Sequence, residues 1–198
     1  MFGNRAPAAK NVNGQVHFMG AVSTGGSDNF AFTLPPALRP SVTEWIPIGL
    51  CNAAKGRMRI LSTGDITIDS ESGFANAGCF TSLEGASFVL SANSGTAPTL
   101  ATGWTNGSFN SGPVRVRNDN GIARFSGATS LGTGATVMTL PAQFRPATNV
   151  WLYVDFVGAG RGRVLVSPNG TVSVDPATAS TLSAAESFLS LEGAEFGI

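Results

Sequence analysis

The sequence predicts an all-β protein made of two tandem antiparallel β-sandwich domains of the jelly-roll kind, related by internal duplication. Three observations lead to this fold class. A nine-residue stretch occurs twice, at corresponding places in the two halves of the chain. Short runs of residues alternate between apolar and polar, as strands with one buried face do. The 25 Gly and 11 Pro among 198 residues supply the turns between many short strands.

The repeated stretch runs from Phe32 to Pro40 and again from Met138 to Pro146. The offset of 106 positions also relates Arg39 to Arg145, Gly56 to Gly162, Arg57 to Arg163, Gly64 to Gly170 and Asp69 to Asp175. Loop changes shift the offset to 107 for Gly20 and Gly127, and to 108 for Ser82–Gly85 and Ser190–Gly193. Such a long repeat indicates a duplicated domain rather than a solenoid. We expect domains at residues 1–91 and 92–198, the second with a connector at about 92–112.

Within each copy, the expected strands follow in the same order. A turn at Asn-Gly precedes a first strand, and a Gly/Ser-rich loop leads to a second strand that stops at proline, which has no N–H for a ladder. The Leu-Pro…Arg-Pro segment is then a constrained corner, because each proline fixes its own φ. In the first copy the strands fall at 15–20, 30–34, 45–50, 56–68 (a hairpin) and 80–88, and in the second at 120–127, 135–140, 151–156, 162–174 and 188–196.

Alternation along the hairpins predicts which side chains are buried. It places one parity inward, namely Met58, Ile60, Ile66 and Ile68 in the first copy and Val164, Val166, Val172 and Val174 in the second. Between the two prolines of each corner, Leu38 and Phe144 are expected to fill the core. Only 178–187 has a helical tendency, and it is short.

Composition and charge argue against some classes of binding partner. The formal net charge is zero and charged residues make up 12% of the chain, which argues against nucleic acid or an anionic membrane as partner. No window approaches the roughly 18 apolar residues of a membrane helix, and Met1–Asn13 lacks the apolar core of a secretory signal. We therefore expect a soluble, unprocessed protein whose weakly charged surface lies against other subunits.

The two cysteines, Cys51 and Cys79, both fall in the first copy. The aligned positions of the second copy are Val157 and Ser187, so a disulfide is not part of the shared fold. The expected state is two reduced, partly buried thiols in a protein made in a cytosol.

Catalytic and metal chemistry find little support in the sequence. Hydrolysis would need a nucleophile with a base or paired carboxylates, and the single histidine, His17, aligns with Arg124. Asp65 and Asp69 share a strand face, yet no Asp-x-Asp-x-Asp-Gly run supplies a calcium loop. We expect no enzyme activity, no cofactor and no metal site.

The recurring charged residues allow two interpretations. Arg39 and Arg145, Arg57 and Arg163, and Glu84 and Glu192 recur in a chain that has few charges. One interpretation is sugar recognition by guanidinium and carboxylate groups beside tryptophan. The favoured one is structural, with the pairs holding the corner to the last strand. The candidate glycan or interface contacts are Trp45, Trp104 and Trp151, although core or inter-subunit packing is favoured for Trp45 and Trp151.

The ordered landmarks of the second copy resemble the β-sandwich head domains of bacteriophage tail fibres and related virion surface proteins. These landmarks are Trp104-x-Asn-Gly, Pro113-x-Arg-x-Arg, Asn-Gly-x-x-x-Phe-x-Gly127, Leu140-Pro-x-x-Phe-Arg-Pro146, Gly-x-Val-x-Val174 and Ser190-Leu-Glu-Gly-x-x-Phe196. The likeness covers nearly all of the second copy and most of the first. It implies a virion protein, commonly trimeric, whose loops touch the host surface or whose faces attach to the particle.

The resemblance therefore leads us to expect a non-enzymatic phage virion surface structural protein, made and assembled in the host cytoplasm. Its partners would be other tail or capsid subunits and further copies of itself, as a trimer. Fibres usually bring a long shaft, whereas the first head-like domain begins by about Pro7, which favours an adaptor, collar or capsid decoration protein over a complete fibre. The alternative is a carbohydrate-binding head that engages bacterial surface glycans. Trp104 and the connector would lie at a domain or subunit boundary.

Overall fold

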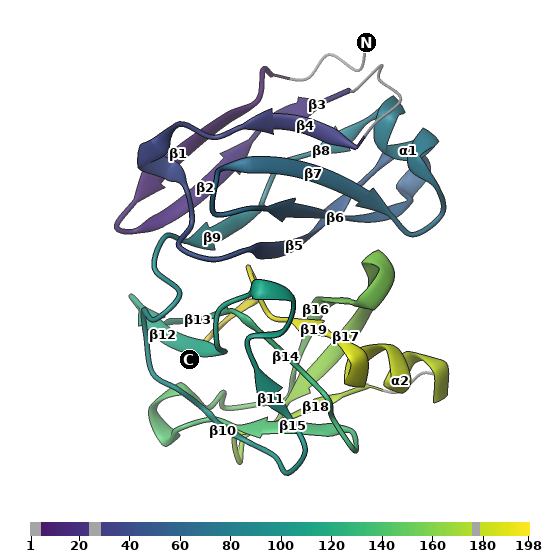
Figure 1. Ribbon diagram of the computed structural model, residues 1–198. Coiled ribbons are helices and arrows are strands. Elements are labelled where there is room, and N and C mark those ends of the chain that lie inside the picture. The colour runs from purple at the N-terminus through teal and green to yellow at the C-terminus, as the bar shows by residue number, and fades with distance from the viewer. Residues whose placement is uncertain (1–4, 24–28, 176–178) are drawn as a thin grey trace. The chain divides into compact units, whose positions relative to one another are not determined.

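A computed structural model describes residues 5–23, 29–175 and 179–198 of the chain (Figure 1). Most of its regular structure is antiparallel β-sheet, so the predicted all-β class is confirmed. The chain forms two compact units, one made of Met1–Ser91 with Gly158–Gly160 and the other of Ala92–Val157 with Arg161–Ile198. No helix within the described ranges has the length and hydropathy to cross a membrane.

The first unit contains two main sheets and a short strand pair. One sheet has the order β1 (Ala8–Val12), β2 (Gln15–Met19), β9 (Ser87–Val89), and the other has the order β4 (Phe30–Thr33), β7 (Asp65–Ser70), β6 (Lys55–Ile60), β5 (Glu44–Gly49). The short pair is β3 (Ala21–Val22) with β8 (Thr81–Ser82). Side chains of both sheets form one apolar core that includes Val16, Phe88, Met58 and Ile66.

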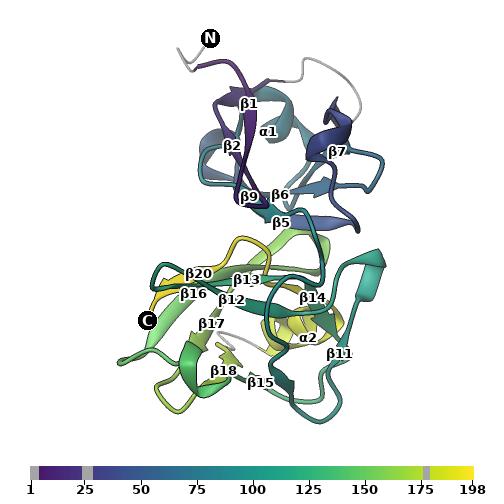
Figure 2. The same ribbon diagram turned by 90° about the vertical axis from the view of Figure 1, so that its left-hand side faces the viewer.

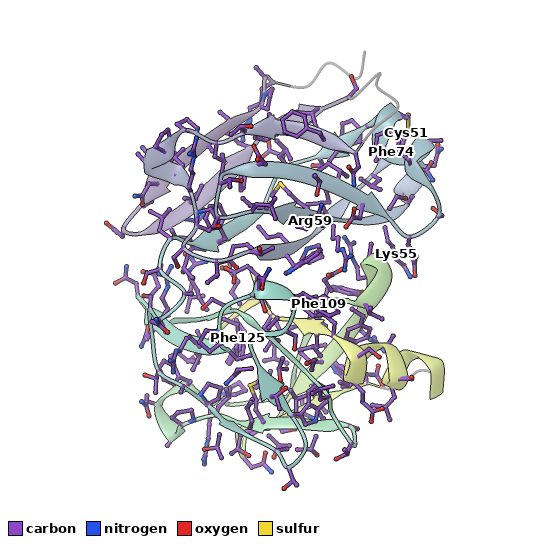
Figure 3. All side chains as sticks on the ribbon, in the orientation of Figure 1. Cys51, Lys55, Arg59, Phe74, Phe109 and Phe125 are labelled. Atoms are coloured by element: carbon purple, nitrogen blue, oxygen red, sulfur yellow. A yellow bond between two sulfur atoms is a disulfide. The ribbon has the colours of Figure 1, made fainter. Side chains whose placement is uncertain are left out.

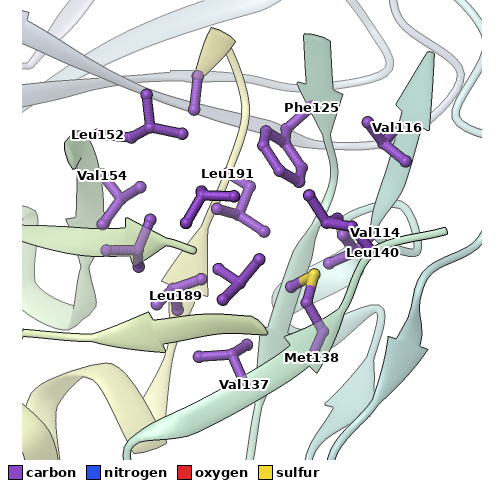
Figure 4. Close-up of a cluster of buried hydrophobic side chains, with 14 of the residues drawn as sticks. Val114, Val116, Phe125, Val137, Met138, Leu140, Leu152, Val154, Leu189 and Leu191 are labelled. Carbon is purple, nitrogen blue, oxygen red and sulfur yellow. The ribbon is translucent and has the colours of Figure 1, made fainter. Parts of the chain in front are cut away.

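The second unit has a three-stranded and an eight-stranded sheet. The first has the order β12 (Arg115–Asp119), β13 (Ile122–Ser126), β20 (Glu195–Gly197), which Figure 2 shows side by side. The second has the order β10 (Thr99–Leu100), β15 (Thr136–Thr139), β18 (Thr171–Val174), β17 (Gly160–Val166), β16 (Val150–Phe156), β19 (Leu189–Ser190), β14 (Ala128–Ser130), β11 (Thr105–Asn106). Figure 4 shows the apolar core of the second unit, in which Phe125, Leu140 and Leu191 point toward one another.

The same strand pairings occur in both units at the offset seen in the sequence. The order β1-β2-β9 corresponds to β12-β13-β20, and β4-β7-β6-β5 corresponds to β15-β18-β17-β16. Even an irregularity recurs, because the register shifts between Phe30 and Phe32 and again between Thr136 and Met138. The pairings agree with the repeat in the sequence, and an origin by duplication stays a prediction.

The predicted inner faces of the hairpins are confirmed. All eight side chains expected to point inward are at most 2% exposed: Met58, Ile60, Ile66, Ile68, Val164, Val166, Val172 and Val174. The hairpin turns also match, since Gly64 N donates to Leu61 O and Gly170 N donates to Ser167 O, each over 2.8 Å. Each of these glycines has a positive φ, +93° and +89°, which side chains other than glycine rarely adopt.

The corners after the second strand are 3₁₀ turns. They are η1 (Pro36–Leu38) and η4 (Ala142–Phe144). Phe144 is buried in the core, as expected, whereas Leu38 is only half-buried. The helical tendency near the C-terminus becomes α2 (Ala179–Ser187), and a further helix, α1 (Phe74–Cys79), was not expected from the sequence.

The prediction of two reduced thiols is wrong, because Cys51 and Cys79 form a disulfide with their Cα atoms 5.8 Å apart. Cys51 opens the short turn η2 (Cys51–Ala53) after β5, and Cys79 ends α1 just before β8. A hydrogen bond of 3.0 Å from Cys51 N to Phe80 O holds the two segments together. Figure 3 labels Cys51 in the first unit. The bond closes the α1 segment onto the sheet in the first unit only, since Val157 and Ser187 stand at the aligned positions.

The connector is part of the second unit's fold and not a boundary between the two units, while its expected place at a subunit boundary stays a prediction. It supplies β10 and β11 to the eight-stranded sheet, and the 3₁₀ turn η3 (Ser108–Asn110) follows them. Trp104 is 5% exposed and belongs to the core of this unit. Its ring covers Gly132, where a Cβ atom would collide with it. Trp104 therefore serves packing within one unit.

Candidate functional site

A tryptophan, an arginine and an aspartate form a row across the outer face of the first unit's four-stranded sheet. Trp45 lies on β5, Arg57 on β6 and Asp69 on β7. The guanidinium carbon of Arg57 is 4.3 Å from the centre of the Trp45 ring. The Nε atom of Arg57 donates to Oδ2 of Asp69 over 3.0 Å. The carboxylate thus orients a cation that stacks on an aromatic ring, an arrangement that favours the charged pair at a surface.

The second unit carries the same row at the same offset. The guanidinium carbon of Arg163 is 5.0 Å from the centre of the Trp151 ring, and Arg163 forms an ion pair with Asp175. The backbone supports this pairing, since Asp175 N donates to Arg163 O over 2.9 Å. The sequence contains the signal for this row, because its members recur at one offset and lie on the strand parity opposite to the core.

The two rows differ in how accessible the aromatic ring is. Trp45 is 8% exposed, and a second guanidinium carbon, that of Arg59, lies 5.6 Å from its ring centre. Trp151 is 49% exposed, and Tyr153, two residues later on the same side of β16, is 68% exposed. We call Trp151, Tyr153, Arg163 and Asp175 the aromatic face of the second unit.

The aromatic face offers flat apolar rings next to groups that donate and accept hydrogen bonds. Tyrosine, tryptophan and arginine are the residue types enriched where proteins contact other proteins. Aromatic rings with adjacent polar groups also suit a sugar ring, whose C–H faces are apolar and whose hydroxyls need partners. The face is therefore a candidate binding surface, for protein or for glycan.

The recurring arginines of the corner have a backbone partner instead. Arg39 Nε donates to Leu34 O over 3.0 Å, and Arg145 Nε donates to Leu140 O over 3.1 Å. The same leucines donate their N–H groups to the hairpin glycines, Leu34 to Gly64 O over 2.9 Å and Leu140 to Gly170 O over 2.8 Å. Each arginine thus braces the corner against the hairpin turn.

The recurring glutamates hold a different place. Glu84 Oε1 accepts from Gly20 N over 2.7 Å, and Glu192 Oε2 accepts from Gly127 N over 2.8 Å. Each of these glycines has a positive φ, and a Cβ atom there would collide with backbone carbonyls. The expected link from the corner arginines to the last strand is therefore replaced by two separate braces, one made by the arginines and one by the glutamates.

Glu84 and Glu192 differ in burial. Glu84 is exposed and also accepts two hydrogen bonds from Arg5, of 2.8 and 2.9 Å. The hydrogen bond from Arg5, followed by that from Gly20 N, lowers the pKa of the Glu84 carboxyl below its ordinary value. Glu192 is 3% exposed. Near it, burial lowers the pKa of Arg117, an effect that the charges of Asp119 and Glu192 oppose.

The residues considered for catalysis or metal binding do not come together in one site. His17 is half-buried on β2. Asp65 accepts from the hydroxyls of Thr33 and Thr63 over 2.7 and 2.9 Å, and these bonds, led by that from Thr33, lower the pKa of its carboxyl. Among the described residues no group of His, Cys, Asp and Glu is placed to hold a metal ion.

No protein-family model, curated protein or solved structure matches the chain. The resemblance to phage head domains consequently stays a prediction from the order of short motifs.

Proposed function

We propose that this chain is a non-enzymatic phage virion surface structural protein, a tail-fibre, adaptor or capsid decoration subunit. It assembles symmetrically, as a trimer, and attaches to other virion proteins. The observation that carries the proposal is the aromatic face, where Trp151 and Tyr153 leave 49% and 68% of their surface open in the isolated chain. Large aromatic side chains at a surface are typical of interface cores.

The low charge of the chain supports the same proposal. With 12 basic and 12 acidic residues and a net charge of zero, a monomer has little electrostatic repulsion against self-association. Closed cyclic symmetry is the usual outcome for such homo-oligomers. The resemblance to phage head domains adds the trimer and the virion.

Light scattering of the purified protein tests assembly through the aromatic face. We expect the mass of a trimer, three times 20.2 kDa, and a shift toward monomer in the Trp151→Ala/Tyr153→Ala double variant. Leu131→Ala is the matched control, because Leu131 is 66% exposed and lies on a loop outside the face. A wild-type monomer that also fails to associate with a virion partner would refute the proposal.

The second candidate is a carbohydrate-binding head, which the arrangement of Arg163 and Asp175 beside Trp151 favours. These groups supply a donor and an acceptor next to the Trp151 ring, which is 49% exposed and offers a surface that a sugar can stack on. A glycan array of bacterial envelope sugars tests it. Reproducible binding that Trp151→Ala abolishes and Leu131→Ala leaves intact favours this role, and no binding by the wild type rejects it.

A further inference from the structure

An apolar groove lies between the two sheets of the first unit. Its volume is about 310 Å³, and it is lined by Pro7, Ala8, Ala9, Phe32, Thr33, Leu34, Pro35 and Leu38. These residues lie on or next to β1 and β4, each the edge strand of its sheet, and on or next to η1. None of these described lining residues carries a charge, so the groove suits an uncharged occupant.

The equivalent place in the second unit is filled by the chain itself. The segment Thr96–Ala101 runs between the edges of β12 and β15, which correspond to β1 and β4. At one edge, Thr96 N donates to Val116 O over 2.8 Å and Val116 N donates to Thr96 O over 2.9 Å. At the other, Ala101 N donates to Val137 O over 2.9 Å. Figure 1 shows the short strand β10 of this segment alongside β15.

The filling segment buries the side chains beneath it. Leu100 and Ala101 pack against the core, and the residues at the groove positions are closed off from solvent, with Val114, Val116, Met138 and Phe144 all at most 4% exposed. Their counterparts in the first unit are half-buried or exposed, namely Pro7, Ala9, Phe32 and Leu38. The same framework is therefore complete in one unit and open in the other.

The first unit also presents the backbone groups that the segment uses in the second. Ala9 stands at the place of Val116, and Ala31 at the place of Val137. Within residues 5–23 and 29–91, β1 pairs only with β2, and β4 pairs only with β7. Two outer strand edges with an apolar groove between them form a template for one more strand.

We propose that this groove binds an extended strand supplied by another protein chain. The strand has the chemistry of Thr96–Ala101: it is uncharged, hydrogen-bonds to both edges, carries a proline between them and inserts an apolar side chain equivalent to Leu100. The second unit supplies the evidence for this occupant, because it shows which backbone and side-chain contacts the shared framework accepts. The proposal is independent of the aromatic face and of the virion assignment.

A peptide copied from the chain is the probe. A fluorescent peptide of residues 94–101 (Ser-Gly-Thr-Ala-Pro-Thr-Leu-Ala) is titrated into the full-length protein and its anisotropy is followed. We expect saturable binding, and at least tenfold weaker binding by the same peptide with Leu100→Asp, because a carboxylate would have to enter the apolar groove. Absence of saturable binding, or equal binding of both peptides, would overturn the proposal.

The variant Ala9→Pro tests whether the peptide binds along the outer edge of β1. The equivalent N–H, that of Val116, points away from the neighbouring strand and toward Thr96, so proline at position 9 removes an outward donor and leaves the β1–β2 ladder intact. We expect peptide binding about tenfold weaker, as for the loss of one hydrogen bond. The control, Lys10→Ala, changes the next residue of the same strand and should bind as the wild type does.

Amide chemical shifts of the labelled wild-type protein give a readout that needs no variant. On adding the peptide, the signals of Ala9, Ala31 and Phe32 should move, while those of Val116 and Val137 should not. Shifts confined to Val116 and Val137 would mean that the peptide displaces the chain's own segment in the second unit, which would contradict the proposal. Shifts at neither place, or binding that Ala9→Pro leaves unchanged in a folded variant, would contradict it as well.

Discussion

Arg145 Nε donates a hydrogen bond of 3.1 Å to the carbonyl oxygen of Leu140, five residues earlier in the chain. The bond closes the proline-bounded corner on itself, and the side chain also lies against Gly170, the glycine of the neighbouring hairpin turn. Arg39 and Leu34 form the same bond over 3.0 Å. The arginine thus links two features that recur in both units, the corner and the hairpin turn.

Arg145→Ala should destabilise the second unit by about 1–3 kcal/mol, because a charged hydrogen bond to the corner is lost. Thermal or urea unfolding measures the change, and Arg39→Ala should act in the same way on the first unit. A melt unchanged by Arg145→Ala, together with loss of ligand binding, would instead make Arg145 a functional residue.

Glu192→Ala should lower the free energy of unfolding by about 1–3 kcal/mol, because the buried N–H of Gly127 loses its acceptor. Glu192→Gln keeps an acceptor oxygen and should recover part of the loss. The exposed counterpart, Glu84→Ala, should cost less, since water can reach its partners. Equal losses at the two positions would show that burial does not set the difference.

Acid should weaken the first unit through Glu84. Its folded pKa is lowered by Arg5 and by the Gly20 N–H, so its contribution to stability is present above the ordinary pKa of about 4.3. That contribution is lost as pH falls through the lowered folded value. Melting temperatures from pH 6 to pH 3 should therefore fall less steeply for Glu84→Gln than for the wild type. Parallel curves would exclude this linkage.

Reduction of the Cys51–Cys79 bond should lower the stability of the first unit by about 2–4 kcal/mol, the usual effect of a disulfide that closes a loop of this length. Alkylation before and after reduction, read by mass spectrometry, counts the free thiols. The Cys51→Ser/Cys79→Ser variant should melt like the reduced protein. Two thiols that react before any reduction would contradict the bond.

The sequence predicted the parts of the fold that depend on local pattern. Alternation alone placed Ile60 and Val166 inside, and the hairpin glycines Gly64 and Gly170 lie in their expected turns. The features it missed depend on contacts between distant residues without a repeat to reveal them. Cys79 reaches Cys51 because it lies at the end of α1, a helix whose sequence pattern is weak. Trp104 lies in a connector that has no counterpart in the first copy.

The candidate site was predicted only in part. Trp151 was identified as a possible contact, and the recurrence of Arg163 and Asp175 was visible in the sequence. Their stacking depends on the strands β16, β17 and β18, which bring Trp151, Arg163 and Asp175 into one row. Exposure could not be predicted either, because Trp45 and Trp151 occupy equivalent places and yet are 8% and 49% exposed.

The most direct test of the virion assignment is a low-resolution map of phage particles that carry this protein with a label. The particles would be purified from host cells that produce the chain. The account predicts that the label appears at symmetric positions on the surface of the tail or capsid. Purified particles that contain none of the labelled protein would contradict it.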